Sequence, residues 1–97
     1  MFSGRLINHS DTLMLNICDA DLLGMTLKRD NFTLKITEKC YAEKVVEKEE
    51  AKDLLKRSDN INMAGKEIIT LSVDMGIGSQ DGVKEIDGVP FLIVFKM

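Results

Sequence analysis

Apolar side chains occupy every second position of residues 13–17, and residues 32–36 repeat this alternation. A period of two is typical of a β-strand that buries one of its faces. Residues 5–8 and 25–28 have the composition of two shorter strands, and turn-forming residues separate these segments. The pattern therefore predicts a β-meander within residues 1–37.

The period changes to that of a helix in the middle of the chain. A narrow apolar stripe of Ala51, Leu54 and Leu55 predicts a short helix over residues 46–57, with Glu47 as a poor N-cap. Acidic residues in its first turn and basic residues in its last turn complement the helix dipole. Its own propensity is weak, so we expect it to depend on packing against the rest of the protein.

A second helix is predicted over residues 61–75, because apolar residues recur there at steps of three and four positions. These residues are Ile61, Ala64, Ile68, Leu71 and Met75. Residues 58–60 would cap its start, and Gly76 stands where a left-handed residue ends a helix. Gly65 inside the helix costs about 1 kcal/mol relative to alanine, which suggests that close packing requires a glycine there.

The last part of the chain has the pattern of a β-hairpin. Two extended runs, residues 83–86 and residues 89–95, flank the pair Asp87-Gly88, which is a strong signal for a two-residue turn. The final run is apolar on both faces, so both faces need a cover. Helices can cover one face, and a curled sheet, a loop or a second chain would have to cover the other.

These elements predict an α+β fold. We expect a single two-layer domain over residues 1–97, with a mainly antiparallel sheet and two consecutive helices on one of its faces. The N-terminal meander and the C-terminal hairpin would form the sheet. A chain of 97 residues has the size of one domain.

Composition argues against several classes of partner. The net charge is -3 and no basic patch is visible, which disfavours strong non-specific binding to nucleic acid. A weak or shape-directed RNA contact through Arg5, Lys28, Arg29 and Lys35 stays open. The longest apolar run is far shorter than the roughly 20 residues that span a bilayer, and no signal peptide is visible. We therefore expect a cytoplasmic protein without a membrane partner.

The segment from Cys18 to Gly24 holds the densest candidate chemistry. Asp19 is placed to cap a single helical turn, and Gly24 is placed to end it. Asp19 and Asp21 could instead bind a ligand or share acid–base work, and Cys18 would need a lowered pKa to act as a nucleophile. The spacing of Cys18 and Cys40 fits two free thiols, with a disulfide as the alternative.

Other polar residues give weaker signals. His9 is the single histidine and fits a solvated turn, which leaves too few ligands for a zinc site. Asn62 fits a cap or a loop contact, with polar recognition as the alternative. The glycine-rich residues 76–82 fit a connection between a helix and a strand, because a phosphate-binding loop needs the opposite order. We predict no catalytic residue, no metal site and no cofactor.

Short motifs along almost the whole chain match the motifs of a known family, in the same order. They are Ile17-Cys18-Asp19, Asp21-Leu22-Leu23-Gly24, Cys40-Tyr41, Glu49-Glu50-Ala51, Leu54-Leu55, Asn62-Met63-Ala64-Gly65, Gly76-Ile77 and Gly88-Val89-Pro90. Through them the chain resembles the archaeal "domain of unknown function 424" family. The resemblance implies a small cytoplasmic α+β protein, and an association of the family with translation genes would imply a ribosome-linked or RNA-linked role. Phe91 stands where the resemblance leads us to expect a histidine.

Three functions remain open at this point. The first is a non-catalytic binding module, associated with translation or RNA–protein complexes, that contacts a protein or ribonucleoprotein partner. The second is a small enzyme or ligand-binding protein that uses the segment from Cys18 to Gly24. The third is a homodimer whose interface covers the final strand. The candidate binding residues are Cys18, Asp19, Asp21, Gly24, Asn62 and Gly65.

Overall fold

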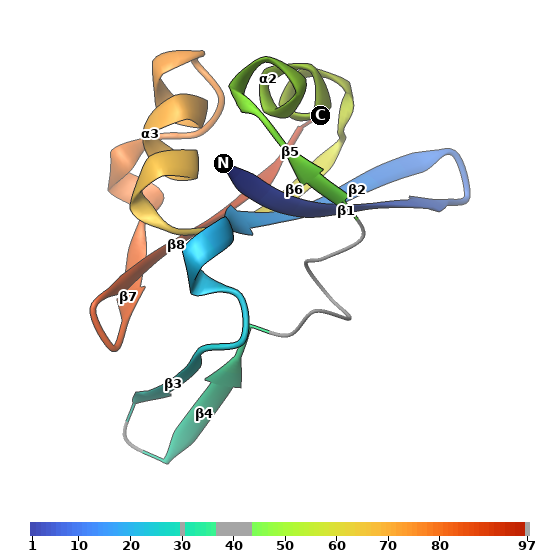
Figure 1. The fold of residues 1–97 in the computed structure, drawn as a ribbon. Helices are drawn as coiled ribbons and strands as arrows, with labels where there is room; N and C mark the ends of the chain where they lie inside the picture. Colours follow the sequence, from blue (N-terminus) through green and yellow to red (C-terminus); the bar gives the residue numbers. More distant parts are fainter. Residues whose placement is uncertain (30, 37–43, 97) are drawn as a thin grey trace.

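A six-stranded sheet with two helices on one face forms the body of the protein (Figure 1). The computed structural model describes residues 1–29, 31–36 and 44–96. The strands run in the spatial order β5-β1-β2-β6-β8-β7, and every neighbouring pair is antiparallel except β2 and β6. Their bounds are β1 Phe2–His9, β2 Thr12–Asp19, β5 Lys44–Val46, β6 Asn60–Ala64, β7 Lys84–Ile86 and β8 Val89–Phe95. The predicted α+β class with a mainly antiparallel sheet is confirmed.

The two helices are α2 (Lys48–Arg57) and α3 (Lys66–Asp74), and they are not consecutive as predicted, because β6 lies between them in the chain. Helix α2 begins two residues later than predicted, because Val46 belongs to β5. Glu47 is its N-cap and makes no side-chain capping bond, while Lys96 donates from Nζ to the carbonyls of Leu55 and Lys56 at the other end. Neither helix in the described ranges has the length and apolarity to cross a membrane.

The prediction of one long helix over residues 61–75 is wrong in its first part. Residues 60–64 form β6, which lies between β2 and β8 in the middle of the sheet. Ile61 and Met63 are buried on the side of the helices. Over a few residues, the apolar positions of such a strand can also fit the three-and-four spacing of a helix. Gly65 follows with φ at +117°, a conformation outside the α-helix, so α3 begins only at Lys66.

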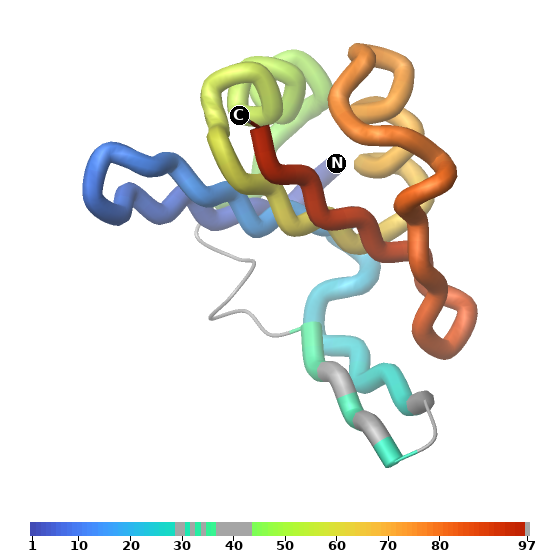
Figure 2. Tube along the Cα trace, turned by 180° about the vertical axis from the view of Figure 1, so that it is seen from behind, coloured from blue at the N-terminus to red at the C-terminus, as the bar shows by residue number. Residues whose placement is uncertain are grey.

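The predicted N-terminal meander is also wrong, although its four strands exist. Strands β1 and β2 pair in the main sheet, whereas β3 (Thr26–Arg29) and β4 (Phe32–Lys35) form a separate two-stranded sheet. A 3₁₀ turn at Ala20–Leu22 and the positive φ of Gly24 redirect the chain between the two pairs. Figures 1 and 2 show β3 and β4 on the opposite side of the main sheet from the helices.

Two apolar clusters lie on the two faces of the main sheet. The larger cluster packs α2 and α3 on Leu15, Ile17 and Ile61. The smaller cluster joins Cys18, Leu27, Ile36, Ala64 and Val89. Strands β3 and β4 therefore cover only one end of the second face, and the rest of it has no second layer among the described residues.

The predicted C-terminal hairpin is confirmed. Asp87 and Gly88 have φ of +52° and +80°, as the favoured two-residue hairpin turn requires, and β7 pairs with β8 through them. Gly76, with φ at +81° after α3, has the predicted left-handed conformation at a helix end. The glycine-rich segment after Gly76 connects helix α3 to strand β7, also as predicted.

Candidate functional site

Asp19 caps a helix, but not the turn that follows it in the sequence. Its side chain makes no capping bond to the 3₁₀ turn of residues 20–22. Instead, its two carboxylate oxygens accept hydrogen bonds from the backbone N–H groups of Glu67 (3.0 Å) and Ile68 (2.8 Å). These are N–H groups of the first turn of α3, which have no partner inside the helix. The carboxylate therefore joins the end of β2 to the start of α3.

Gly65 makes this contact feasible. A Cβ atom at position 65 would lie 2.4 Å from Cγ of Asp19, well inside van der Waals contact. The positive φ of this residue would also strain any other side chain. The expectation that close packing explains Gly65 is met, although the close neighbour is the side chain of Asp19 and Gly65 precedes the helix.

Burial raises the pKa of Asp19 above its ordinary value of 3.8. The two backbone hydrogen bonds from Glu67 and Ile68 act in the opposite direction, while the charges of Glu67 and Asp21 raise the pKa further. Desolvation outweighs the hydrogen bonds, because the carboxylate is almost fully buried. Both oxygens of Asp19 serve a structural role.

Cys18 is fully buried between the sheet and the β3–β4 pair. Burial, and then the nearby charges of Asp19 and Asp21, raise the pKa of its thiol to about 12. A nucleophilic cysteine needs the opposite shift. Cys18 is a free thiol, whereas its predicted alternative partner Cys40 lies outside the described residues.

Cys18 is expected to resist alkylation in the folded protein. In a Cys40→Ser variant, Cys18 is the single thiol, and its rate of reaction with iodoacetamide at pH 8 can be followed by mass spectrometry. We expect a rate about a thousandfold lower in the folded protein than in urea, because the pKa rises by about three units from 9.0 and each unit lowers the thiolate fraction tenfold. Rates within tenfold of each other would contradict the burial.

The remaining residues of the predicted segment do not complete a catalytic site. Asp21 is exposed in the 3₁₀ turn, and Gly24 supplies a positive φ where the chain turns toward β3. None of the three described cavities is lined by Asp19 or Asp21. Over the described ranges, no three His, Cys, Asp or Glu side chains gather as metal ligands would. His9 is exposed at the end of β1.

Asn62 lies away from these residues, on the uncovered part of the sheet. We call this surface the open face. Along each strand, the side chains of this face alternate with those that face α2 and α3. The strand registers place one row across β1, β2, β6 and β8, which consists of Arg5, Asn16, Asn62 and Ile93. The open face includes Arg5, Asn16, Asn62, Lys84, Phe91, Ile93 and Phe95, and the row that ends at Phe95 adds Ile7, Met14 and Asn60.

The centre of the open face is an amide pair. Nδ2 of Asn62 donates to Oδ1 of Asn16 at 2.7 Å, so the two side chains fix each other in orientation on neighbouring strands. The predicted role of Asn62 as a cap or loop contact is wrong, because the residue lies inside β6. The partner Asn16 was not singled out from the sequence, since one polar residue in an alternating strand carries no signal of its own.

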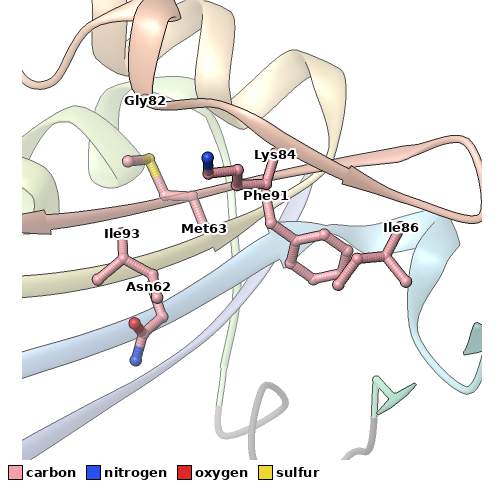
Figure 3. A pocket seen from close by; sticks show the side chains of 7 residues that line it. All are labelled: Asn62, Met63, Gly82, Lys84, Ile86, Phe91 and Ile93. Atoms are coloured by element: carbon pink, nitrogen blue, oxygen red, sulfur yellow. The ribbon is translucent and has the colours of Figure 1, made fainter. Parts of the chain in front are cut away.

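Beside the amide pair, β8 exposes large apolar side chains. Ile93 and Phe95 are 59% and 72% exposed. A cavity of about 510 Å³ lies along this strand, and Asn62, Lys84, Phe91 and Ile93 contribute to its lining. Figure 3 shows Asn62, Phe91 and Ile93 on one side of the sheet, while Met63 turns toward the other side. The cavity is within the size range of small-ligand sites and combines apolar walls with an amide and an amine.

The charges of the sheet are divided between its two faces. Asp19 and Glu85 are the acidic residues of the six strands. Asp19 bonds to α3, and Glu85 lines a cavity with residues of α3. The charged strand residues of the open face are Arg5 and Lys84, which are both basic. The strands therefore place basic but no acidic side chains on the open face, in a protein whose net charge is -3.

Comparison with known proteins agrees with the fold. A crystal structure of an uncharacterized conserved protein from Methanopyrus kandleri superimposes with a TM-score of 0.82 and 29% sequence identity. The match covers 99% of this chain and 93% of that chain. No curated protein matches the chain. The model of the family described as "Protein of unknown function (DUF424)" matches residues 7–97, so this chain belongs to the DUF424 family.

Proposed function

We propose that this protein is a non-catalytic binding module that contacts single-stranded RNA through its open face, as part of a ribonucleoprotein complex. The observation that carries the proposal is the combination of exposed aromatic, amide and basic side chains on a sheet face whose strands place no carboxylate there. Phosphate groups avoid carboxylates, and a basic face inside an acidic protein directs an anionic ligand to one surface.

The geometry of β8 suits unpaired bases. Phe91, Ile93 and Phe95 lie on the same side of one strand, at intervals of about 7 Å between successive side chains. Single-stranded RNA is recognised mainly by stacking of its bases on aromatic side chains, and by hydrogen bonds to base edges. The amides of Asn16 and Asn62 offer both a donor and an acceptor beside this aromatic row. The cavity along β8 leaves room for a base between them.

The alternative of an enzyme that uses the segment from Cys18 to Gly24 has less support. Its thiol has a raised pKa, and its buried carboxylate already accepts two hydrogen bonds. A site that bound a substrate with Asp19 would have to break the contact between β2 and α3.

A fluorescence-anisotropy titration with a labelled 12-nucleotide single-stranded RNA at low salt tests the proposal. We expect weak, salt-dependent binding that Phe95→Ala weakens about tenfold, because base stacking on an aromatic residue contributes about 1–3 kcal/mol. Phe95→Leu should weaken it almost as much if the ring stacks on a base. Lys84→Ala should reduce the salt slope by about 0.7, the value for one phosphate contact on a single strand.

Lys66→Ala is the matched control, because Lys66 is an exposed lysine on the side of the helices. It should leave the affinity and the salt slope unchanged. Absence of binding at low salt, or equal effects of the two lysine substitutions, would sink the proposal. If Phe95→Leu binds RNA as tightly as the parent protein does, the ring of Phe95 does not stack on a base, and the proposed contact is wrong.

A further inference from the structure

Part of the outer edge of β8 has no strand beside it. Strand β7 covers only the first half of β8, because its pairing ends with Lys84 opposite Phe91. In the described ranges, no strand pairs with the outer edge from Leu92 to Phe95. The cavity of about 510 Å³ borders this edge, with Gly82 and Lys84 on its far side. Open space therefore lies beside Ile93, beyond the start of β7.

The hydrogen bonds between β8 and β6 show in which direction the backbone N–H and C=O groups of β8 point. The N–H of Gly65 donates to the carbonyl of Pro90, and the N–H of Lys96 donates to the carbonyl of Asp59. Residues with even numbers in β8 thus point their backbone groups toward β6. Since this direction alternates along an antiparallel strand, Ile93 and Phe95 point their N–H and C=O groups outward.

The side chains on this edge are apolar as well. Ile93 and Phe95, which carry the outward backbone groups, are also the two most exposed apolar residues of β8. Proteins usually protect such an edge with lysine, proline or a bulge. Strand β8 has none of these between Phe91 and Phe95. A regular, apolar, unpaired edge is a template for the addition of another strand.

We propose that a second copy of this chain adds its own β8 to this edge in antiparallel orientation, with Val94 of both copies on the two-fold axis. Ile93 of each copy then exchanges two backbone hydrogen bonds with Phe95 of the other copy. The inference goes beyond the RNA-binding proposal and does not depend on it. The two proposals share Ile93, Phe95 and the cavity along β8, but the dimer rests on the backbone groups of the edge, whereas RNA binding rests on side chains of the open face.

The edge favours a second copy over an unrelated peptide because it is complementary to itself. The outward groups of Ile93 and Phe95 lie symmetrically about Val94, so a two-fold axis satisfies all of them. Residues 89–95 carry no charge, and Nζ of Lys96 is held by the carbonyls of Leu55 and Lys56. The residues of β8 that meet across the shared edge are therefore uncharged.

This arrangement has a consequence for the open face. The two sheets continue into each other, so Ile93 of one copy comes beside Phe95 of the other, and cross-strand pairs of this kind are stabilising. The two open faces then form one surface. Four backbone hydrogen bonds and two apolar pairs make a small interface, so we expect a dissociation constant on the order of 100 µM, typical of small, transient interfaces.

Sedimentation equilibrium from about 10 µM to 1 mM, a range set by the weak interface expected here, tests the dimer without RNA. The parent protein should shift from monomer to dimer across this range. Ile93→Pro removes the outward N–H group at an edge position where proline is tolerated, and it should keep the protein monomeric. Ile93→Ala is the matched control, because it keeps the N–H group and should retain most of the association.

A cysteine trap tests the register. Opposed residues that lie between hydrogen-bonded pairs have Cα atoms about 4.5 Å apart, which a disulfide can bridge. In the Cys40→Ser background, Val94→Cys should therefore form a disulfide-linked dimer in a glutathione buffer. Val45→Cys, an exposed position on the opposite edge strand β5, should not.

A parent protein that stays monomeric at every concentration would overturn the dimer. Equal cross-linking at positions 45 and 94 would overturn it as well. Lys84→Ala keeps the two proposals distinguishable, because Lys84 lies on β7 and not on the shared edge, so this substitution should lower the salt slope of RNA binding and leave the monomer–dimer equilibrium unchanged.

Discussion

Gly65→Ala is expected to lower the free energy of unfolding by about 4 kcal/mol, because two costs add at this position. The new Cβ would lie 2.4 Å from Cγ of Asp19, so the carboxylate must move and release the N–H groups of Glu67 and Ile68. The alanine would also have to adopt a φ of +117°. For a protein of this size the loss is a large part of the total stability. Urea denaturation followed by circular dichroism measures it.

Gly76→Ala separates the two costs. Gly76 also has a positive φ, of +81°, but no atom lies within 4 Å of a Cβ built there. This substitution should cost about 1 kcal/mol, the backbone strain alone. The double variant Gly65→Ala with Asp19→Ala should lose much less than the sum of the single losses, because each change disrupts the same contact. Additive losses would show that the two residues act independently.

Asp19→Ala is expected to lower the free energy of unfolding by about 2 kcal/mol. The substitution removes a helix cap and leaves the N–H groups of Glu67 and Ile68 without partners in a buried place. Asp21→Ala is the matched control, because it removes an exposed carboxylate two residues away and should change stability by less than about 0.5 kcal/mol. Equal effects of the two substitutions would contradict the capping role.

The carboxylate of Asp19 makes the free energy of unfolding depend on pH, and the direction of its pKa shift decides the direction of this dependence. The pKa of Asp19 in the folded protein is raised above 3.8, so the folded state binds this proton more tightly than the unfolded chain does. Binding of this proton contributes fully to the free energy of unfolding below pH 3.8, and the contribution is lost as the pH rises through the pKa of Asp19 in the folded protein. Relative to Asp19→Asn, the parent protein should therefore gain stability as the pH falls from 7 to 3.5. A difference that grows in the opposite direction would contradict burial as the dominant cause.

Local pattern predicted the elements of this protein better than their partners. The hairpin through Asp87 and Gly88 was predictable because its signal lies within the residues that form it. The strand at residues 60–64 was not, since Ile61 and Ala64 fit a helical stripe and only pairing with β2 and β8 decides against it. Gly65 is the residue that could have indicated the end of this strand, because a glycine that interrupts a helical pattern also fits a boundary between a strand and a helix.

The candidate site shows a similar division. The prediction that Asp19 caps the turn directly after it is wrong, because its side chain caps α3, where Glu67 lies 48 residues further along the chain, and no local rule can specify that partner. The doubly apolar final strand predicts a cover on both of its faces, whereas the structure leaves Ile93 and Phe95 exposed on one of them. The open face itself could not be predicted, because it is defined by the register of β2, β6 and β8 and by the small area that β3 and β4 cover.

The parallel pairing of β2 with β6 has a consequence for the way the chain reaches this structure. Residues 46 positions apart, such as Asn16 and Asn62, meet there, and closing so long a loop costs entropy before any contact repays it. The hairpins β1–β2 and β7–β8 close short loops and can form early, whereas the central junction between them must wait for a collision of distant segments. We therefore expect assembly of the middle of the sheet to be the slow event in the folding of this chain.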